Sequence, residues 1–429
     1  MLINNKVGKQ EFLTKLKSLF IPDTSEMPRR RHDLDWLRVL AFGLLILYHC
    51  GMFYVVNWGW HVKSAYQSEF LENIMLMVEP WRMPILWIIS GISIRFVLAK
   101  VSVVRFVSMR SLRLLLPLLF GVLVIVPPQL YVEMTFNGDL NMNYWQFLQV
   151  FFSEGGDTFA KYPYGIWPHI DVNHLWFLRS LWQYSLVMVV LLPLLNSKWL
   201  VTSIEWLFKQ HAIIAILCAV LPIFIIHISM DLQSARYPIG FTFMLYGYLI
   251  GWNANFWQRL KGKTKPLLIL SAACYLCLIL FYNLVWQGVF KGEQASHSLL
   301  VFGMSIYSLM RVLGVLTAFA LAYNFLNRKS KRSAYFNEAV YPFYILHQTL
   351  IVVIGYNLSS LNLGPIVEPI LLITLTIISC FVGFEIIRRI ELLRPCFGLK
   401  VAHNYNPVLV KLGYSAAAIC IMPIAWQLL

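Results

Sequence analysis

Charged residues are scarce in this sequence, and their scarcity excludes an ordinary soluble domain. They make up 13% of the 429 residues, whereas a soluble domain carries about 25%. Hydrophobic residues make up 59% of the chain, and the mean hydropathy is +0.65. This composition indicates an integral membrane protein.

The sequence signatures of several enzyme and pump classes are missing. There is no GxxxxGKS/T phosphate loop, no HExxH zinc helix, no GxSxG nucleophile elbow and no dinucleotide-binding fingerprint. ATP-driven pumps and the common hydrolases are therefore disfavoured. Few acidic residues lie inside apolar segments, which disfavours a proton relay built from carboxylates. The seven cysteines lie mostly in apolar segments, so we expect reduced, structural thiols and no metal site.

Apolar segments of about 20 residues, the length of a membrane helix, recur along the chain. They predict an all-α polytopic membrane protein with ten transmembrane helices and an eleventh that Lys411 interrupts. Residues 34–429 are predicted to form one transmembrane domain, and residues 1–33 a cytoplasmic segment whose EFLTKLKSLF stretch makes an interfacial helix. The predicted spans are 36–56, 80–99, 113–131, 174–195, 212–230, 238–253, 266–285, 299–324, 339–356, 367–387 and 407–427.

The net charge of +15 follows the topology and needs no nucleic-acid partner. With the N-terminus in the cytoplasm, the cytoplasmic segments hold 28 of the 35 Lys and Arg residues. This bias is the positive-inside rule, so we expect a multi-pass membrane protein with a cytoplasmic N-terminus. The seven remaining basic residues are Lys63, Arg82, Lys161, Arg179, Arg236, Lys291 and Arg311.

Arg38 and His49 form the most informative pair in the sequence. They stand eleven residues apart on the first predicted helix, and eleven steps of about 100° bring both side chains to one helix face. The rise between them is about 16 Å, half of a hydrocarbon core of about 30 Å. An arginine at the cytoplasmic surface therefore places His49 near mid-bilayer, where an ionisable group is a candidate functional residue.

Arg110 and Arg113 begin the third predicted helix on its cytoplasmic side. Positive-inside anchoring explains them, and so does a fork that binds phosphate groups bidentately. Arg82 enters the second predicted helix from outside, where it either snorkels to headgroups or contacts a substrate.

Two further histidines are predicted within spans. His174 starts the fourth predicted helix from outside, with Arg179 one turn deeper, and His347 lies in the ninth. A membrane histidine can simply bridge helices through hydrogen bonds. It can also act as a general base near neutral pH.

Aromatic residues gather in two extracytoplasmic loops. Trp58 and its neighbours follow the first predicted helix, and others lie in the long connection from Glu133 to Asn173, which we expect to lack regular structure. They are typical of an interfacial aromatic belt. A platform for stacking sugars is the functional alternative, and the length of the second loop favours it.

These residues carry a family resemblance. Arg38 and His49 on the first helix, the WRMPILWIISG stretch, the double arginine followed by Pro117, and YPFYILH ending in His347 together resemble the motifs of the acyltransferase 3 family of integral membrane acyltransferases. The four motifs occur in order over most of the first ten spans. HVKS after the first helix and HLWFL from His174 resemble the branch that modifies periplasmic glucans. A paired-glutamate motif of many O-acetylating members is absent where this chain has LRSLWQY, which also favours that branch.

The resemblance implies a reaction and roles for these residues. An acyl-CoA donor would bind from the cytoplasm at Arg110 and Arg113 with help from Arg38, and no metal would be needed. His49 would be a general base for a hydroxyl of an extracytoplasmic glycan, or would take the acyl group itself. The acceptor side would use Arg82, His174, Arg179, His347 and Trp58. A secondary transporter or flippase of glycans or lipid-linked sugars is the alternative that helix number alone leaves open.

Overall fold

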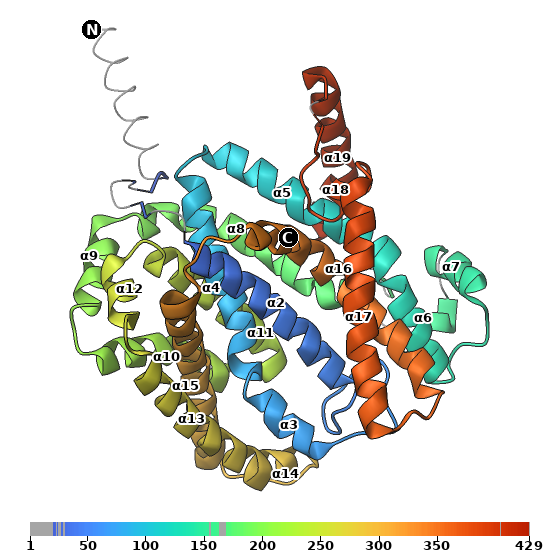
Figure 1. Ribbon diagram of the computed structural model, residues 1–429, viewed down its shortest axis with the longest axis horizontal. Coiled ribbons are helices and arrows are strands. Elements are labelled where there is room, and N and C mark those ends of the chain that lie inside the picture. Colours follow the sequence, from blue (N-terminus) through green and yellow to red (C-terminus); the bar gives the residue numbers. More distant parts are fainter. Residues whose placement is uncertain are drawn as a thin grey trace. The chain divides into compact units, whose positions relative to one another are not determined.

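The computed structural model describes residues 20–428 except 23, 25, 26, 29, 30, 154, 155, 163–168 and 404. The predicted interfacial helix falls outside the described residues apart from Phe20. The chain folds into two compact units that alternate along the sequence, as Figure 1 lets the reader follow by colour. The first comprises Met1–Ala41, Leu76–Ser108 and Tyr184–Lys329, and the second Phe42–Met75, Met109–Gln183 and Ser330–Leu429. The prediction of a single transmembrane domain stays a prediction.

Almost all regular structure is helical, and the described residues contain no β-strand. Four helices run from one unit into the other: α2 (His32–Met52), α3 (Glu69–Leu76), α5 (Val103–Phe120) and α8 (Trp176–Leu195). The first unit also holds α4 (Glu79–Leu98), α9 (Lys198–Leu207), α10 (Ala212–Ser229), α11 (Leu232–Ile250), α12 (Ala254–Leu260), α13 (Thr264–Phe281), α14 (Gln287–Phe290) and α15 (His297–Leu321). The second holds α6 (Pro127–Phe136), α7 (Tyr144–Phe152), α16 (Lys331–Ser359), α17 (Gly364–Arg389), α18 (Leu393–Cys396) and α19 (Pro407–Leu428).

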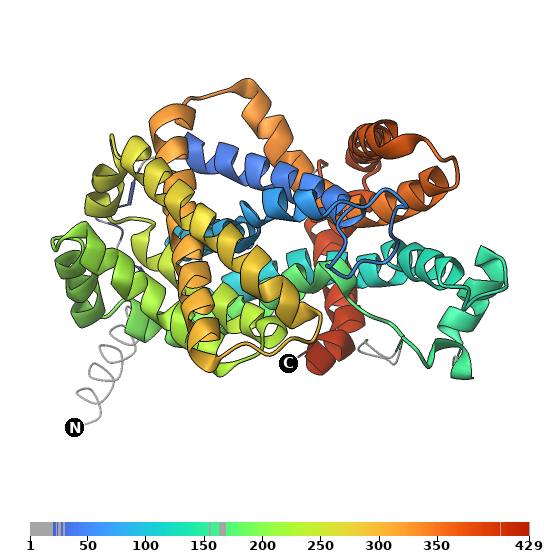
Figure 2. The same cartoon turned by 90° about the horizontal axis from the view of Figure 1, so that it is seen from below.

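In the first unit, α4 and α11 approach each other closely because glycines lie at their contact. A Cβ at Gly91 would lie 2.0 Å from Met244 O, and one at Gly247 would lie 2.1 Å from Ile88 O. Small residues allow such backbone contact between membrane helices. Gly91 of the WRMPILWIISG motif therefore serves helix packing. In the same unit α13 packs along α15, as Figure 2 shows.

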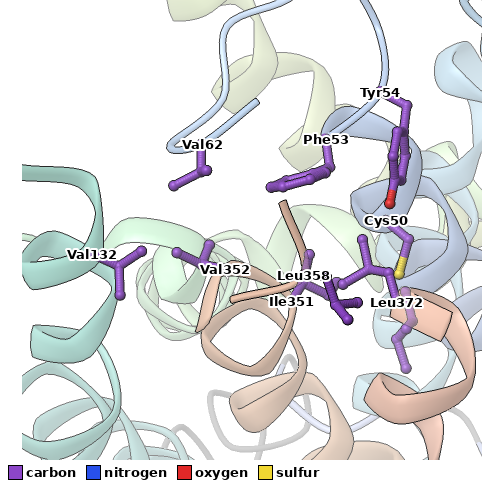
Figure 3. Packing of buried hydrophobic residues seen from close by; sticks show 10 residues of the cluster. Cys50, Phe53, Tyr54, Val62, Val132, Ile351, Val352, Leu358 and Leu372 are labelled. Carbon is purple, nitrogen blue, oxygen red and sulfur yellow. The ribbon is translucent and has the colours of Figure 1, made fainter. Parts of the chain in front are cut away.

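In the second unit, α16 and α17 pack along each other and support the end of α2. Phe343 and Phe381 meet edge to face with ring centroids 4.9 Å apart. Figure 3 shows Cys50 and Phe53 among the buried side chains of α16 and α17. The last turn of α2, which carries His49, is thereby fixed against α16.

Nine helices or helix runs among the described residues are long and apolar enough to cross a membrane. They match nine of the first ten predicted spans. The exception is 238–253, which corresponds to α11. That helix has 19 residues, but Arg236 and other polar residues in its first turns lower its hydropathy. The eleventh predicted span corresponds to α19, whose described apolar part is Pro407–Ile419. The polytopic helical fold is confirmed.

The connection from Glu133 to Asn173 differs from the prediction of a loop without regular structure. Helix α6 continues to Phe136, and α7 follows with a capping box in which Asn143 and Gln146 satisfy each other's backbone N–H groups. Phe147 and Phe151 of α7 are buried in a small hydrophobic cluster, against which Tyr144 packs. These aromatic residues form a local core, because an amphipathic helix of nine residues needs an apolar partner to be stable.

Candidate active site

Two histidines that are far apart in the sequence form a hydrogen-bonded pair inside the second unit. His49 lies in the last turn of α2 and His347 in the middle of α16. His49 Nδ1 is 2.8 Å from His347 Nε2, and the two rings stack with centroids 5.0 Å apart and planes 8° apart. His347 is buried, whereas His49 is partly exposed. One ring of the pair is therefore accessible and the other is enclosed.

The backbone of α16 determines which ring nitrogens carry hydrogen. His347 Nδ1 is 2.7 Å from Tyr344 O, and because a carbonyl oxygen only accepts, Nδ1 is the donor. In the neutral ring Nε2 then has the lone pair and accepts from His49 Nδ1. His49 consequently has its own lone pair on Nε2, the atom that can take a proton. The pair thus consists of a candidate base and a group that orients it.

Aromatic rings surround the accessible histidine. The Trp60 ring lies 5.3 Å from the His49 ring, and Tyr48 contacts His49 edge to face at 6.1 Å. Trp58, the predicted sugar platform, stacks on Tyr48 with centroids 6.2 Å apart. Aromatic side chains therefore lie next to one basic nitrogen, a combination that small-molecule sites commonly have.

His174 is buried beside the pair, with its ring centroid 5.5 Å from that of His347. Its Nε2 donates to Ile345 O over 3.0 Å, and its Nδ1 lies 3.3 Å from Gln129 Nε2. Tyr344 donates its hydroxyl hydrogen to His174 O over 2.5 Å. These bonds tie α16 to the segment that directly precedes α8.

The HVKS stretch after α2 holds the outer end of that helix. Lys63 Nζ donates to Met52 O over 2.9 Å and to Val55 O over 2.7 Å, which satisfies carbonyls at the helix end. Burial lowers the pKa of Lys63 to about 8, although the Glu72 carboxylate opposes this shift. Ser64 donates to Glu368 Oε1 over 2.6 Å, and thereby ties the loop to α17.

A network of amide and imidazole side chains extends outward from the pair, and the sequence did not predict it. Gln348 Nε2 lies 2.8 Å from Asn173 Oδ1 and 3.0 Å from His61 Nε2. Asn173 directly precedes His174, and Gln348 directly follows His347. The only sequence feature that could have pointed to these two residues is that each is adjacent to a predicted histidine.

The predicted arginines fall in different parts of the chain. Arg110 and Arg113 lie three residues apart on α5, and Tyr341 of α16 donates its hydroxyl hydrogen to Arg113 O over 3.2 Å. Tyr341 precedes His347 by six residues, about 9 Å along the helix axis. The double arginine is thus connected to the histidine pair through α16.

Of the three other predicted arginines, two lie in the first turn of a helix and Arg38 lies in the second turn of α2. Arg38 lies on α2 in the first unit and donates to Ser93 Oγ over 3.2 Å. Arg82 lies in the first turn of α4 in the first unit, and Arg179 in the first turn of α8 in the second. Helix α2 is continuous from His32 to Met52, so the predicted common face of Arg38 and His49 is confirmed.

The family model of the acyltransferase 3 family, described as an acyltransferase domain, matches residues 31–385. The chain belongs to this family. The match includes α2 and α16 and therefore both members of the histidine pair. No curated protein and no solved structure is significantly similar to the chain. Family membership and the apolar helices make this acyltransferase 3 protein a multi-pass membrane acyltransferase.

Proposed function

We propose that this acyltransferase 3 protein is an O-acyltransferase of a bacterial inner membrane. It moves an acyl group, acetyl or succinyl, from cytoplasmic acyl-CoA to hydroxyl groups of an extracytoplasmic glycan such as a periplasmic glucan. The glucan acceptor is supported by the resemblance of HVKS and HLWFL to glucan biosynthesis protein C. The observation that carries the proposal is the His49–His347 pair, because acyl transfer to a hydroxyl needs a base at the reacting oxygen.

The reaction at the histidine pair proceeds through formation and collapse of a tetrahedral intermediate. His49 Nε2 takes the proton of the acceptor hydroxyl while the oxygen attacks the thioester carbonyl, which forms a C–O bond and a tetrahedral intermediate. The intermediate collapses with loss of the C–S bond, and the CoA thiolate recovers the proton from the imidazolium. His347 Nε2 accepts the Nδ1 hydrogen of His49 throughout, which holds the ring in the reactive tautomer and stabilises its charge. The route through an acylated His49 uses the same nitrogen.

Arg110 and Arg113 hold the phosphate groups of the donor in this proposal. Residues three apart on a helix lie on one face, so the two guanidinium groups of α5 can form a single fork. Guanidinium groups match phosphoryl oxygens bidentately. From the level of Arg113 the pantetheine arm extends along α16 toward His347.

Replacing Arg113 by Lys is expected to weaken acyl-CoA binding about tenfold, because the bidentate contact is lost although the charge remains. Arg110→Lys should behave in the same way. The measurement is the thermal shift caused by CoA in purified protein. Arg105→Lys, on the same helix, is the matched control and should bind CoA normally. Unchanged CoA binding in both Arg113→Lys and Arg110→Lys would show that these residues only anchor the helix.

The direct test of the function is acyl incorporation from labelled acyl-CoA by purified protein in detergent, with and without a glucan acceptor. Label in the glucan that depends on the protein supports an acyltransferase of this kind. Glycan uptake by proteoliposomes without any acyl transfer would favour a transporter or flippase.

A further inference from the structure

A second polar group lies near the histidine pair, at the outer end of the second unit. His61 Nδ1 donates to Glu133 Oε2, which joins the loop after α2 to helix α6. Both side chains remain partly exposed, with relative exposures of 16% for His61 and 25% for Glu133. A carboxylate and an imidazole are therefore accessible from outside while they are held in a fixed orientation.

Two amide side chains fix the other edge of His61. Gln348 Nε2 lies 3.0 Å and Asn173 Nδ2 3.4 Å from His61 Nε2. Asn173 has a φ of 44°, in the left-handed region that costs free energy for residues other than glycine. Unfavourable backbone conformations persist where the surrounding structure imposes them, and they are common at ligand sites.

Trp60 connects this group to the catalytic pair. Its ring lies 5.3 Å from the His49 ring and 5.3 Å from the His61 ring. A ligand that contacts the Trp60 ring would therefore lie near both His49 and His61. The five residues His49, Trp60, His61, Glu133 and His347 all belong to the second unit.

Several contacts other than the His61–Glu133 pair hold the loop in place. Lys63 already joins the loop to the end of α2, and Ser64 joins it to α17. Glu72 accepts hydrogen bonds from the backbone of Val56 and Asn57 over 2.9 Å and 2.6 Å. A further ionisable pair, partly open to solvent, is therefore available for a ligand.

We propose that Glu133, oriented by His61, is a subsite for a second hydroxyl group of a polyhydroxylated acceptor, whose first hydroxyl lies at His49. A sugar ring offers an apolar face and hydroxyls on both of its edges, so it can lie on Trp60 and reach both groups. Few, fixed polar groups beside aromatic walls are the usual means of orienting a small molecule. The subsite rests on the proposed function and specifies its acceptor. It selects glycans with neighbouring hydroxyls over simple alcohols.

The test is the steady-state kinetics of Glu133→Gln in purified protein, with a glucan oligosaccharide as acceptor. The amide retains the size of the side chain and can accept from His61, but it removes the charge. We expect the acceptor KM to rise about tenfold or more, because a hydrogen bond to a charged group is lost. The acyl-CoA KM should not change. His61→Gln is an independent second variant with the same expected pattern.

Asp139→Asn is the matched control, because Asp139 also forms an outer ion pair, with Lys161, and bonds the Tyr162 hydroxyl. It should keep the acceptor KM of the unmodified protein. An unchanged acceptor KM in both Glu133→Gln and His61→Gln would overturn the subsite while acyl transfer itself continues. Equal rises in the KM of acceptor and acyl-CoA would also overturn it. Failure of the proposed function is separate, because the unmodified protein would then transfer no acyl group.

Discussion

His49→Ala is expected to lower the rate of acyl transfer about 10²–10⁴-fold, the usual contribution of a general base. The lone pair on His49 Nε2 is the proton acceptor in the proposed reaction, and alanine supplies none. Folding should survive, since the variant leaves one buried acceptor, His347 Nε2, at a cost of about 1–3 kcal/mol. The measurement is single-turnover transfer from labelled acyl-CoA, together with the thermal shift by CoA as a check of folding.

His227→Gln is a suitable control for this variant. His227 is another buried histidine of a membrane helix, and its Nδ1 lies 2.7 Å from Ser308 Oγ. The mechanism does not use it, so transfer should continue. Normal turnover in His49→Ala would remove His49 from the mechanism.

His347→Leu is expected to reduce kcat about 10²–10⁴-fold, as the loss of the orienting member of a catalytic pair does. Leucine fills similar space but cannot accept the hydrogen of His49 Nδ1, so His49 can adopt the unreactive tautomer. His347→Gln should retain more activity, since its Oε1 can take the place of Nε2. The KM values for acyl-CoA and acceptor should change little in both variants.

The comparison of these two variants separates orientation from packing. If glutamine and leucine reduce kcat equally and both raise the KM values, His347 serves only the packing of α16 against α2. Undiminished kcat in His347→Leu would exclude any role of the pair.

The sequence was sufficient to predict how residues on one and the same helix are arranged. The spacing of Arg38 and His49 predicted their common face, because helical periodicity is local information. The pairing of His49 with His347 could not be predicted. The two residues lie 298 positions apart, and their contact depends on the packing of α16 against the end of α2.

The aromatic residues show where composition alone misled the interpretation. Tyr144 and Phe147 lie in the connection that was predicted to lack regular structure, yet Phe147 is buried and stacks with Tyr144 at 6.0 Å. In the sequence, an aromatic residue that packs within its own loop cannot be distinguished from one that stacks on a sugar. Trp60, by contrast, gains its importance from contacts with His49 and His61 that only the fold provides.

The glutamate of the proposed acceptor subsite could not be predicted from the sequence either, because its contacts also depend on the fold. Glu133 lies at the end of an apolar segment, where a carboxylate usually only marks the membrane surface. Its partner His61 belongs to the HVKS stretch that resembles the glucan-modifying branch, but no local pattern relates residues 72 positions apart. Side-chain networks of this kind follow from tertiary packing.

In the proposed reaction, donor and acceptor reach the histidine pair from opposite sides of the membrane. From the charge bias we expect Arg110 and Arg113 on the cytoplasmic side of the membrane and the loop with Trp60 and His61 on the other side. The decisive measurement uses proteoliposomes in which all proteins have one orientation, with labelled acyl-CoA only on the N-terminal side and glucan only on the other. Labelled glucan is the expected result in this arrangement. Product that forms only when acyl-CoA and glucan are on the same side would contradict it.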